Sequence, residues 1–304
     1  MTAAKALLAG VELGGTKCVC VIGTGPGDIR GSVSVPTASD AQATLARLGA
    51  ALVELRAAHG EFAALGLASF GPLDLDLDSE TYGRIERTPK EGWSGVDVLG
   101  FFSRLVAGTV GVTTDVIAAA LAEGRWGAAR GCADYAYVTV GTGIGVGVIM
   151  GARPLIGGHH PELGHIRIAR APGDRWPGSC RFHGDCLEGL ASGPAIAARS
   201  GASPADLAPD EPVWDGVAHA LVQLAHNLVL SFAPRRILFG GGVALAQPGL
   251  LPRIRSGLAA SLGDYLDLER LSGGVDALIL PAGLGALAGP SGALAVAAEA
   301  LAPR

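Results

Sequence analysis

The sequence lacks the positive charge that a nucleic-acid-binding protein needs. Only 17% of its 304 residues are charged, and 28 Asp and Glu outnumber 23 Lys and Arg, giving a formal net charge of −5 at pH 7. Proteins that bind nucleic acid present a basic face, so we expect no such partner. A bound polyanion would have to be held locally, by backbone amides, a metal ion or a few placed cations. Hydrophobic residues make up 49% of the chain, which excludes wholesale disorder.

Cysteine is scarce, and the five that are present do not suit a disulfide framework. Cys18 and Cys20 alternate with apolar residues, as on one face of a buried strand, and Cys132 follows a glycine in an expected loop. Cys180 and Cys186 belong to a candidate metal site. An odd number of thiols used in this way is typical of a reducing compartment.

A secretory signal is not evident, because no charged segment followed by a long apolar core opens the sequence. Residues 277–298 carry no charge and are numerous enough to cross a bilayer, but glycines and two prolines, Pro281 and Pro290, interrupt them. We therefore expect a cytoplasmic protein without a membrane span.

Hydrophobic patterning predicts alternating strands and helices, and the length of the chain favours two domains. The strands are expected at residues 7–13, 18–22, 29–35, 62–69, 111–114, 135–140, 145–150 and 236–239. The helices are expected at residues 41–58, 116–126, 213–232 and 290–302. The strand–glycine turn–strand pattern at the start returns at residues 135–150, which indicates an internal duplication.

Three glycine clusters are candidates for binding phosphate. The turns at residues 14–17 (GGTK) and 141–145 (GTGIG) lack bulky side chains, so a phosphate chain can approach their backbone N–H groups. No GxxxxGK[ST] loop occurs, and no G-x-G-x-x-G opens an early helix, which argues against a P-loop or a dinucleotide fold. Together with a third cluster, Gly240-Gly241-Gly242, the two hairpins predict a nucleotide in a cleft between two related domains.

Four potential metal ligands occur in a short stretch: His165, Cys180, His183 and Cys186. Two residues separate each neighbouring pair among the last three. Two thiolates and two imidazoles suit tetrahedral zinc and leave no open position for a catalytic water. The site is either a purely structural staple or a clamp that also shapes a substrate site, since Glu162 lies on one side of it and Glu188 on the other.

Asp115 is the candidate general base, because it is a carboxylate at the junction between a predicted strand and a predicted helix. The alternative is a carboxylate placed only to interact favourably with the helix N-terminus. Local sequence leaves both possibilities open.

The chain resembles the ROK family (repressor, open reading frame, kinase) and, within it, the bacterial fructokinases. The resemblance covers nearly the whole sequence and rests on the segments ELGGTK, ASFGPLD, TVGTGIGVG, HPELGH, CRFHGDCLEGLASGP and FGGGV. It implies an α/β fold of the actin-like, ribonuclease-H-like ATPase type, with two domains around a central cleft. The smaller domain would comprise residues 1–114 and the returning helix within 289–304, and the larger would comprise residues 115–288.

The resemblance also implies roles for individual residues. Asp115 would be the general base that faces the primary hydroxyl of a sugar. The residues expected to hold the sugar are Thr114, Glu162, His165 and Glu188. Those expected to hold the nucleotide are Gly14, Gly15, Thr16, Lys17, Gly141, Thr142, Gly143, Gly240, Gly241 and Gly242. His165 would serve twice, with one ring nitrogen on zinc and the other toward a sugar hydroxyl, and Glu12 would hold a water on magnesium.

The expected function is ATP-dependent phosphorylation of fructose to fructose 6-phosphate, with zinc as a resident ion and Mg²⁺ accompanying ATP. Threonine at position 114, where many family sugar kinases have asparagine, and the segment Thr88-Pro89-Lys90 favour the fructokinase branch. A mannose or glucose kinase of the same family is the alternative, and a non-catalytic sugar-binding or regulatory protein is a remote one. We expect a homodimer whose partners are ATP and a hexose.

Overall fold

The computed structural model describes residues 6–302, which divide into two compact units. The first unit contains the chain up to Gly127, the segment Leu155–Pro161 and the residues from Ala286 onward. The second unit contains Ala128–Pro154 and Glu162–Gly285. Within the described part of the chain, no helix combines the length and the apolar character needed to span a bilayer.

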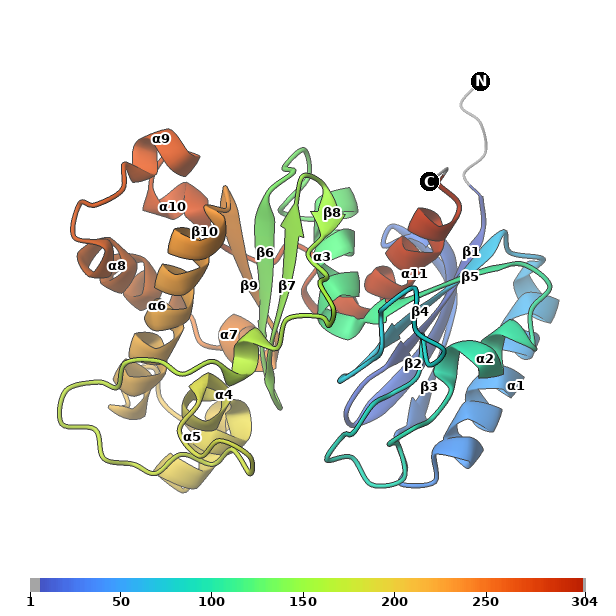
Figure 1. Ribbon diagram of the computed structural model, residues 1–304, viewed down its shortest axis with the longest axis horizontal. Helices are drawn as coiled ribbons and strands as arrows, with labels where there is room; N and C mark the ends of the chain where they lie inside the picture. Colours follow the sequence, from blue (N-terminus) through green and yellow to red (C-terminus); the bar gives the residue numbers. More distant parts are fainter. Residues whose placement is uncertain (1–5, 303–304) are drawn as a thin grey trace. The chain divides into compact units, whose positions relative to one another are not determined.

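Strands in residues 6–302 form two five-stranded sheets, one in each unit (Figure 1). The strands of the first sheet are β1 (Leu8–Leu13), β2 (Lys17–Gly25), β3 (Asp28–Pro36), β4 (Ala64–Ser69) and β5 (Thr109–Thr114). Those of the second sheet are β6 (Tyr135–Val140), β7 (Ile144–Met150), β8 (Arg153–Pro154), β9 (Arg236–Gly240) and β10 (Ile279–Pro281).

The helices of the first unit are α1 (Ala41–His59), α2 (Val98–Ser103), α3 (Asp115–Trp126) and α11 (Ala288–Ala300). Those of the second unit are α4 (Leu187–Ala191), α5 (Gly193–Ser200), α6 (Val213–Phe232), α7 (Gly242–Ala246), α8 (Leu250–Leu262), α9 (Leu268–Ser272) and α10 (Val275–Leu278).

The two sheets have the same topology, which confirms the duplication predicted from the repeated hairpin. Their strand orders are β3-β2-β1-β4-β5 and β8-β7-β6-β9-β10. In each sheet the first strand pairs antiparallel with the second and parallel with the strand that follows a long connection. The glycine turns between β1 and β2 and between β6 and β7 therefore occupy equivalent places.

The core of the first unit follows from the alternation of side chains along its strands. Large residues of β1, β2 and β4 face α1, whose buried positions recur at threes and fours. The opposite face is built from small residues, such as Gly10 and Ala68, and it is covered by α11. Small residues allow that helix to lie close to the sheet, since a Cβ at Gly10 would collide with Ala293 of α11.

The first unit extends beyond residue 114, the predicted boundary, and includes α3. The physical reason is packing, because α3 contacts α11 and β4 of that unit. The helix α11 also contacts β1, β2, β4 and β5, so the late helix returns to the early sheet as expected. In the second unit, α6 buries one face against α4 and α8.

Candidate functional site

The predicted site residues are divided between the two units. The first unit contains Glu12, the hairpin Gly14–Lys17, Thr114 and Asp115, whereas the second contains all the others.

In the first unit, the predicted residues lie at the carboxyl ends of β1 and β5, the two strands that flank β4. Leu13 at the end of β1 pairs with Ser69 of β4, and Ser69 pairs with Thr114 of β5. Since neighbouring strands lie about 4.8 Å apart, the first glycine hairpin and Asp115 lie about 10 Å apart along the same edge. The carboxyl edge of a sheet is where open α/β folds bind their ligands.

Asp115 is the first residue of α3, directly after β5. Its Oδ1 accepts a hydrogen bond from the Val116 N–H at 2.8 Å, and the side chain is partly exposed. Thr114 is buried and its hydroxyl accepts from the Ile117 N–H at 3.3 Å, which caps the helix. The capping threonine fixes the start of the helix, and with it the place of the carboxylate.

Two residues distant in the sequence, Thr37 and Lys90, hold the first glycine hairpin. The Thr37 hydroxyl donates to the Gly14 carbonyl at 2.8 Å, and the Thr37 N–H donates to the Thr16 carbonyl at 3.0 Å. The Lys90 ammonium group donates to the Gly15 carbonyl and lies 5.5 Å from the centroid of the Phe70 ring. Gly15, Thr16 and Lys17 remain exposed, so the turn is open to a ligand.

Glu12 lies two residues before this hairpin, in β1. Burial raises the pKa of its carboxyl group, and the nearby Lys17 opposes that rise. The carboxylate lies against Gly289, where a Cβ would collide with it. A desolvated carboxylate next to a phosphate-type turn fits a cation, because a cation favours its ionised form.

The second glycine hairpin is enclosed by backbone from elsewhere in its unit. The Gly141 N–H donates to the Gly143 carbonyl at 2.9 Å across the turn, and the Gly193 N–H donates to the Gly141 carbonyl at 2.7 Å. Gly241, with a φ of 85°, lies so close to Val140 that a Cβ would collide with the backbone there. The structure thus brings the second and third glycine clusters together within the second unit.

The four predicted metal ligands converge at one place in the second unit. One ligand atom from each of His165, Cys180, His183 and Cys186 lies within 4.8 Å of all the others. The His165 Nδ1 is 3.7 Å from the Cys180 Sγ and 3.5 Å from the Cys186 Sγ, and the His183 Nδ1 is 3.7 Å from the Cys180 Sγ. Zinc–sulfur and zinc–nitrogen bonds of about 2.3 and 2.0 Å in a tetrahedron require an S···N separation of about 3.6 Å.

The electrostatics of this cluster also suit a cation. Burial raises the pKa of the Cys186 thiol to about 11, so a thiolate at this position needs a positive charge beside it. The donor set and its spacing therefore fit zinc.

His165 connects the cluster to the second hairpin through Glu188. With Nδ1 turned to the cysteines, the His165 Nε2 lies 3.9 Å from the Glu188 Oε1. The Glu188 Oε2 accepts a hydrogen bond from the Ile144 N–H at 3.0 Å, next to Gly143. Both side chains are partly exposed, and Glu162, three residues before His165, is exposed.

An Arg–Asp network braces the long segment between the metal ligands. Asp185 pairs with Arg167 and, at 3.0 Å, with Arg170. Asp174 accepts from both terminal nitrogens of Arg199 at 3.0 and 3.1 Å. These pairs hold the irregular segment in place where regular secondary structure is sparse.

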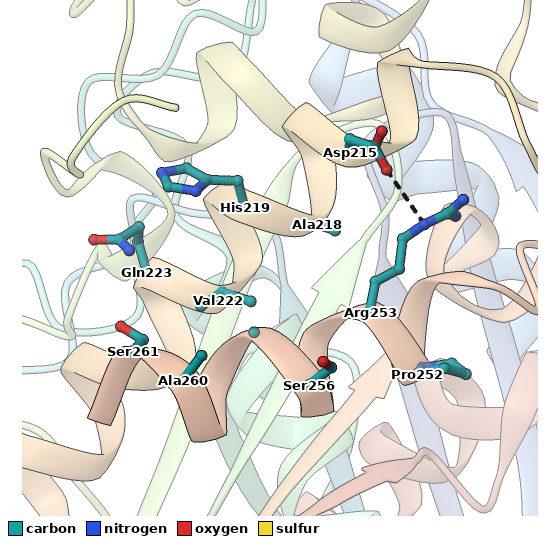
Figure 2. Close-up of a pocket in the computed structure, with 11 residues that line it drawn as sticks. Asp215, Ala218, His219, Val222, Gln223, Pro252, Arg253, Ser256, Ala260 and Ser261 are labelled. Carbon is teal, nitrogen blue, oxygen red and sulfur yellow. Dashed lines mark ion pairs between the residues drawn. The ribbon is translucent and has the colours of Figure 1, made fainter. Parts of the chain in front are cut away.

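A groove of the second unit lies between α6 and α8, away from these residues (Figure 2). It encloses about 790 Å³ and is bordered by polar side chains that include His219, Gln223 and Ser256, while Asp215 and Arg253 form an ion pair at 3.4 Å. None of the predicted site residues lines it. Its size reflects small residues on facing helices rather than convergent chemistry.

Some residues that hold the site were not identified from the sequence. Thr37 and Gly193 each hold a glycine hairpin from a distant part of the chain. Thr37 lies in no motif, and Gly193 lies in the segment CRFHGDCLEGLASGP without a role of its own there, because both contacts depend on how distant parts of the chain are assembled. Lys90 was noted in the sequence only as part of the segment Thr88-Pro89-Lys90, without a contact to the hairpin.

Fold and site together define a duplicated α/β protein of the predicted actin-like type, with a glycine hairpin in each half and a Cys/His metal-type cluster in the second. The chain belongs to the ROK family, whose model matches residues 8–300.

Similar proteins cover almost the whole chain. A fructokinase from Pediococcus pentosaceus is 38% identical over 97% of this chain and 99% of its own. A fructokinase from Zymomonas mobilis is 42% identical over 79% of each chain. A solved ROK glucokinase from Streptomyces griseus, in complex with glucose and AMPPNP, is 26% identical with a TM-score of 0.76 and covers 96% of this chain and 99% of its own.

Proposed function

We propose that this protein is an ATP-dependent hexose kinase that phosphorylates the primary hydroxyl of fructose to give fructose 6-phosphate. The two fructokinases, which are 38% and 42% identical to this chain over the aligned segments, support the substrate and the reaction class. The bound glucose and AMPPNP of the related glucokinase support a sugar and an ATP-like nucleotide as ligands.

The observation that carries the proposal is the link from the metal-type cluster to the second hairpin. Glu188 has one oxygen near the His165 Nε2 and the other on the Ile144 N–H. One carboxylate thereby couples a sugar-orienting imidazole to a phosphate-type turn within a single unit. Such coupling suits an enzyme that must align a hydroxyl with a phosphoryl group.

Asp115 acts as the general base in this proposal. The hexose hydroxyl oxygen attacks the γ-phosphorus, the bond from that phosphorus to the β–γ bridging oxygen breaks, and the hydroxyl proton passes to Asp115. Phosphoryl transfer through a loose transition state needs alignment and charge neutralisation more than covalent help. The open first hairpin, with Lys17 and Lys90 beside it, supplies backbone donors and positive charge.

The proposed resident ion is zinc, held by His165, Cys180, His183 and Cys186, and Mg²⁺ enters with ATP. Bound zinc fixes the ring orientation of His165, and Mg²⁺ neutralises phosphate charge. His165 and Glu162 then hold sugar hydroxyls, while Glu12 stands next to the first hairpin as a candidate partner for a magnesium-bound water.

A broader specificity, for mannose or glucose, is the second candidate, favoured by the likeness to the Streptomyces griseus glucokinase. We extend the proposal to a homodimer, on the family resemblance alone, and to a reducing cytoplasmic compartment, in keeping with the free cysteines. Light scattering tests the dimer.

A coupled ATP-consumption assay tests the function across fructose, mannose, glucose and N-acetylated hexosamines. We expect the highest kcat/KM with fructose. A higher value with mannose or glucose would transfer the proposal to the second candidate. No turnover of any hexose by zinc-loaded protein with Mg²⁺ would overturn it.

A further inference from the structure

The segment Leu155–Pro161 belongs to the first unit, although the chain on both sides of it belongs to the second. It follows β8 and leads directly into Glu162 and the short 3-10 turn Leu163–His165. The chain therefore leaves one unit and re-enters it immediately before two residues proposed to hold the sugar.

His160 attaches this segment to the first unit. Its side chain is buried, and its Nε2 accepts a hydrogen bond from the Leu73 N–H at 3.1 Å. A backbone N–H can only donate, so the Nε2 must be unprotonated and the ring neutral. Burial, reinforced by the charge of His159, lowers the pKa of His160 to about 4, so the ring remains an acceptor near neutral pH.

His159 forms a second and more exposed attachment. Its Nε2 lies 2.7 Å from the Glu86 Oε2, and its Nδ1 lies 2.6 Å from the His160 carbonyl oxygen. Both ring nitrogens thus face oxygen acceptors, an arrangement that an imidazolium paired with a carboxylate satisfies. The two side chains are 40% and 41% exposed, so this pair contributes less than the buried bond of His160.

The residues that follow this segment, Glu162 to His165, are held within the second unit. Gly164 lies against the Ile144 carbonyl so closely that a Cβ would collide with it. The His165 N–H donates to the Glu162 carbonyl at 2.9 Å, and the His165 ring faces the metal-type cluster. Glu162 is thus an exposed residue between a buried anchor at His160 and a buried anchor at Gly164.

We propose that His160 is a positioning residue for hexose binding, which sets the place of Glu162 through its hydrogen bond to Leu73. This inference rests on the proposed function and adds to it a residue that fixes the backbone immediately before Glu162. Only three residues lie between His160 and Gly164. A displacement of the His160 backbone therefore also displaces Glu162. A carboxylate displaced by about 1 Å loses its alignment with a sugar hydroxyl.

The test compares His160→Gln with His160→Asn. The Gln Oε1 can reach the place of the Nε2 and accept from Leu73, whereas Asn is too short to do so. We expect His160→Asn to raise the KM for fructose on the order of tenfold to a hundredfold, and His160→Gln to stay within about threefold of wild type. The KM for ATP should stay within about twofold in both variants. His226→Gln, which loses a contact to Ser261 in the second unit, serves as the matched control.

A measurement on the unaltered protein keeps the proposal testable if the variants fold poorly. Fructose should slow hydrogen exchange of the Leu73 amide about tenfold or more, because the bound sugar fixes Glu162 and the anchor together. An unchanged exchange rate, or a His160→Asn variant with the wild-type KM for fructose, would overturn the inference. Failure of the proposed function is a different result, since wild-type protein would then turn over no hexose at all.

Discussion

The two glycine hairpins occupy equivalent places in sheets of the same topology, yet they are held in different ways. Side chains hold the first one, through Thr37 and Lys90, and its turn residues stay exposed. Backbone and a carboxylate enclose the second, through Gly193, Gly241 and Glu188. The two equivalent turns therefore lie in different environments, one with Lys17 and Lys90 and one beside a carboxylate and neighbouring backbone. We infer that the first neutralises phosphate and the second sets geometry.

The largest effect is expected from the first unit. Asp115→Asn removes the proposed proton acceptor but keeps a similar shape and the bond to Val116. We expect kcat to fall roughly 10²–10⁴-fold, with fructose affinity within a few-fold of wild type. Steady-state kinetics and calorimetric titration with fructose measure the two quantities, and full activity in this variant would remove Asp115 from the mechanism.

Metal removal tests the second unit. Cys180→Ser deletes one thiolate of the cluster, so His165 loses its fixed orientation. We expect loss of bound zinc and a rise in the KM for fructose of roughly 10–100-fold. Elemental analysis and kinetics on the same preparation check this. A metal-free protein with full activity would refute the orienting role and leave at most a structural staple.

Changes at Glu188 test how the second hairpin is held, because this carboxylate accepts a hydrogen bond from the Ile144 N–H. Glu188→Ala leaves the Ile144 N–H without its acceptor, which costs about 1–3 kcal/mol, and we expect KM values for both ATP and fructose to rise about tenfold. Glu188→Gln can still accept that bond but lacks the charge. It should therefore raise the KM for fructose more than that for ATP, and identical effects of the two changes would contradict the double role.

Thr37→Val makes the corresponding change at the open hairpin and should have the smallest effect. The hairpin loses a side-chain hydrogen bond, but Lys90 and the Thr37 N–H still hold the turn. We expect the KM for ATP to rise about threefold, in line with a typical hydrogen bond. If Thr37→Val raised the KM for ATP as much as Glu188→Ala does, the contrast between the two hairpins would be wrong.

Local patterns predicted the parts of the fold that depend on local forces. The helix expected at residues 213–232 has those bounds as α6, and the strand expected at 135–140 has those of β6. The helix has apolar residues at threes and fours along its length, and the strand is a largely apolar run that is almost entirely buried. The metal-type cluster was predictable for a similar reason, because three of its ligands are spaced by two residues.

Long-range features could not be predicted in this way. The placement of α3 in the first unit depends on its packing against α11, from the far end of the sequence. The contacts of Thr37 with the first hairpin and of Glu188 with Ile144 join segments that no motif connects. The attachment of His160 to Leu73 spans 87 positions and involves a histidine that sequence alone does not distinguish from a solvated one.

The return of α11 to the first sheet has a consequence for biosynthesis. The ribosome delivers Ala288–Ala300 only after the second unit has been made, and until then the Gly- and Ala-rich face of β1 and β4 lacks the helix that covers most of it. The part of the chain translated first is therefore the part that matures last. Removing the residues from Ala288 onward should leave the second unit resistant to protease, while the strands of the first sheet are digested.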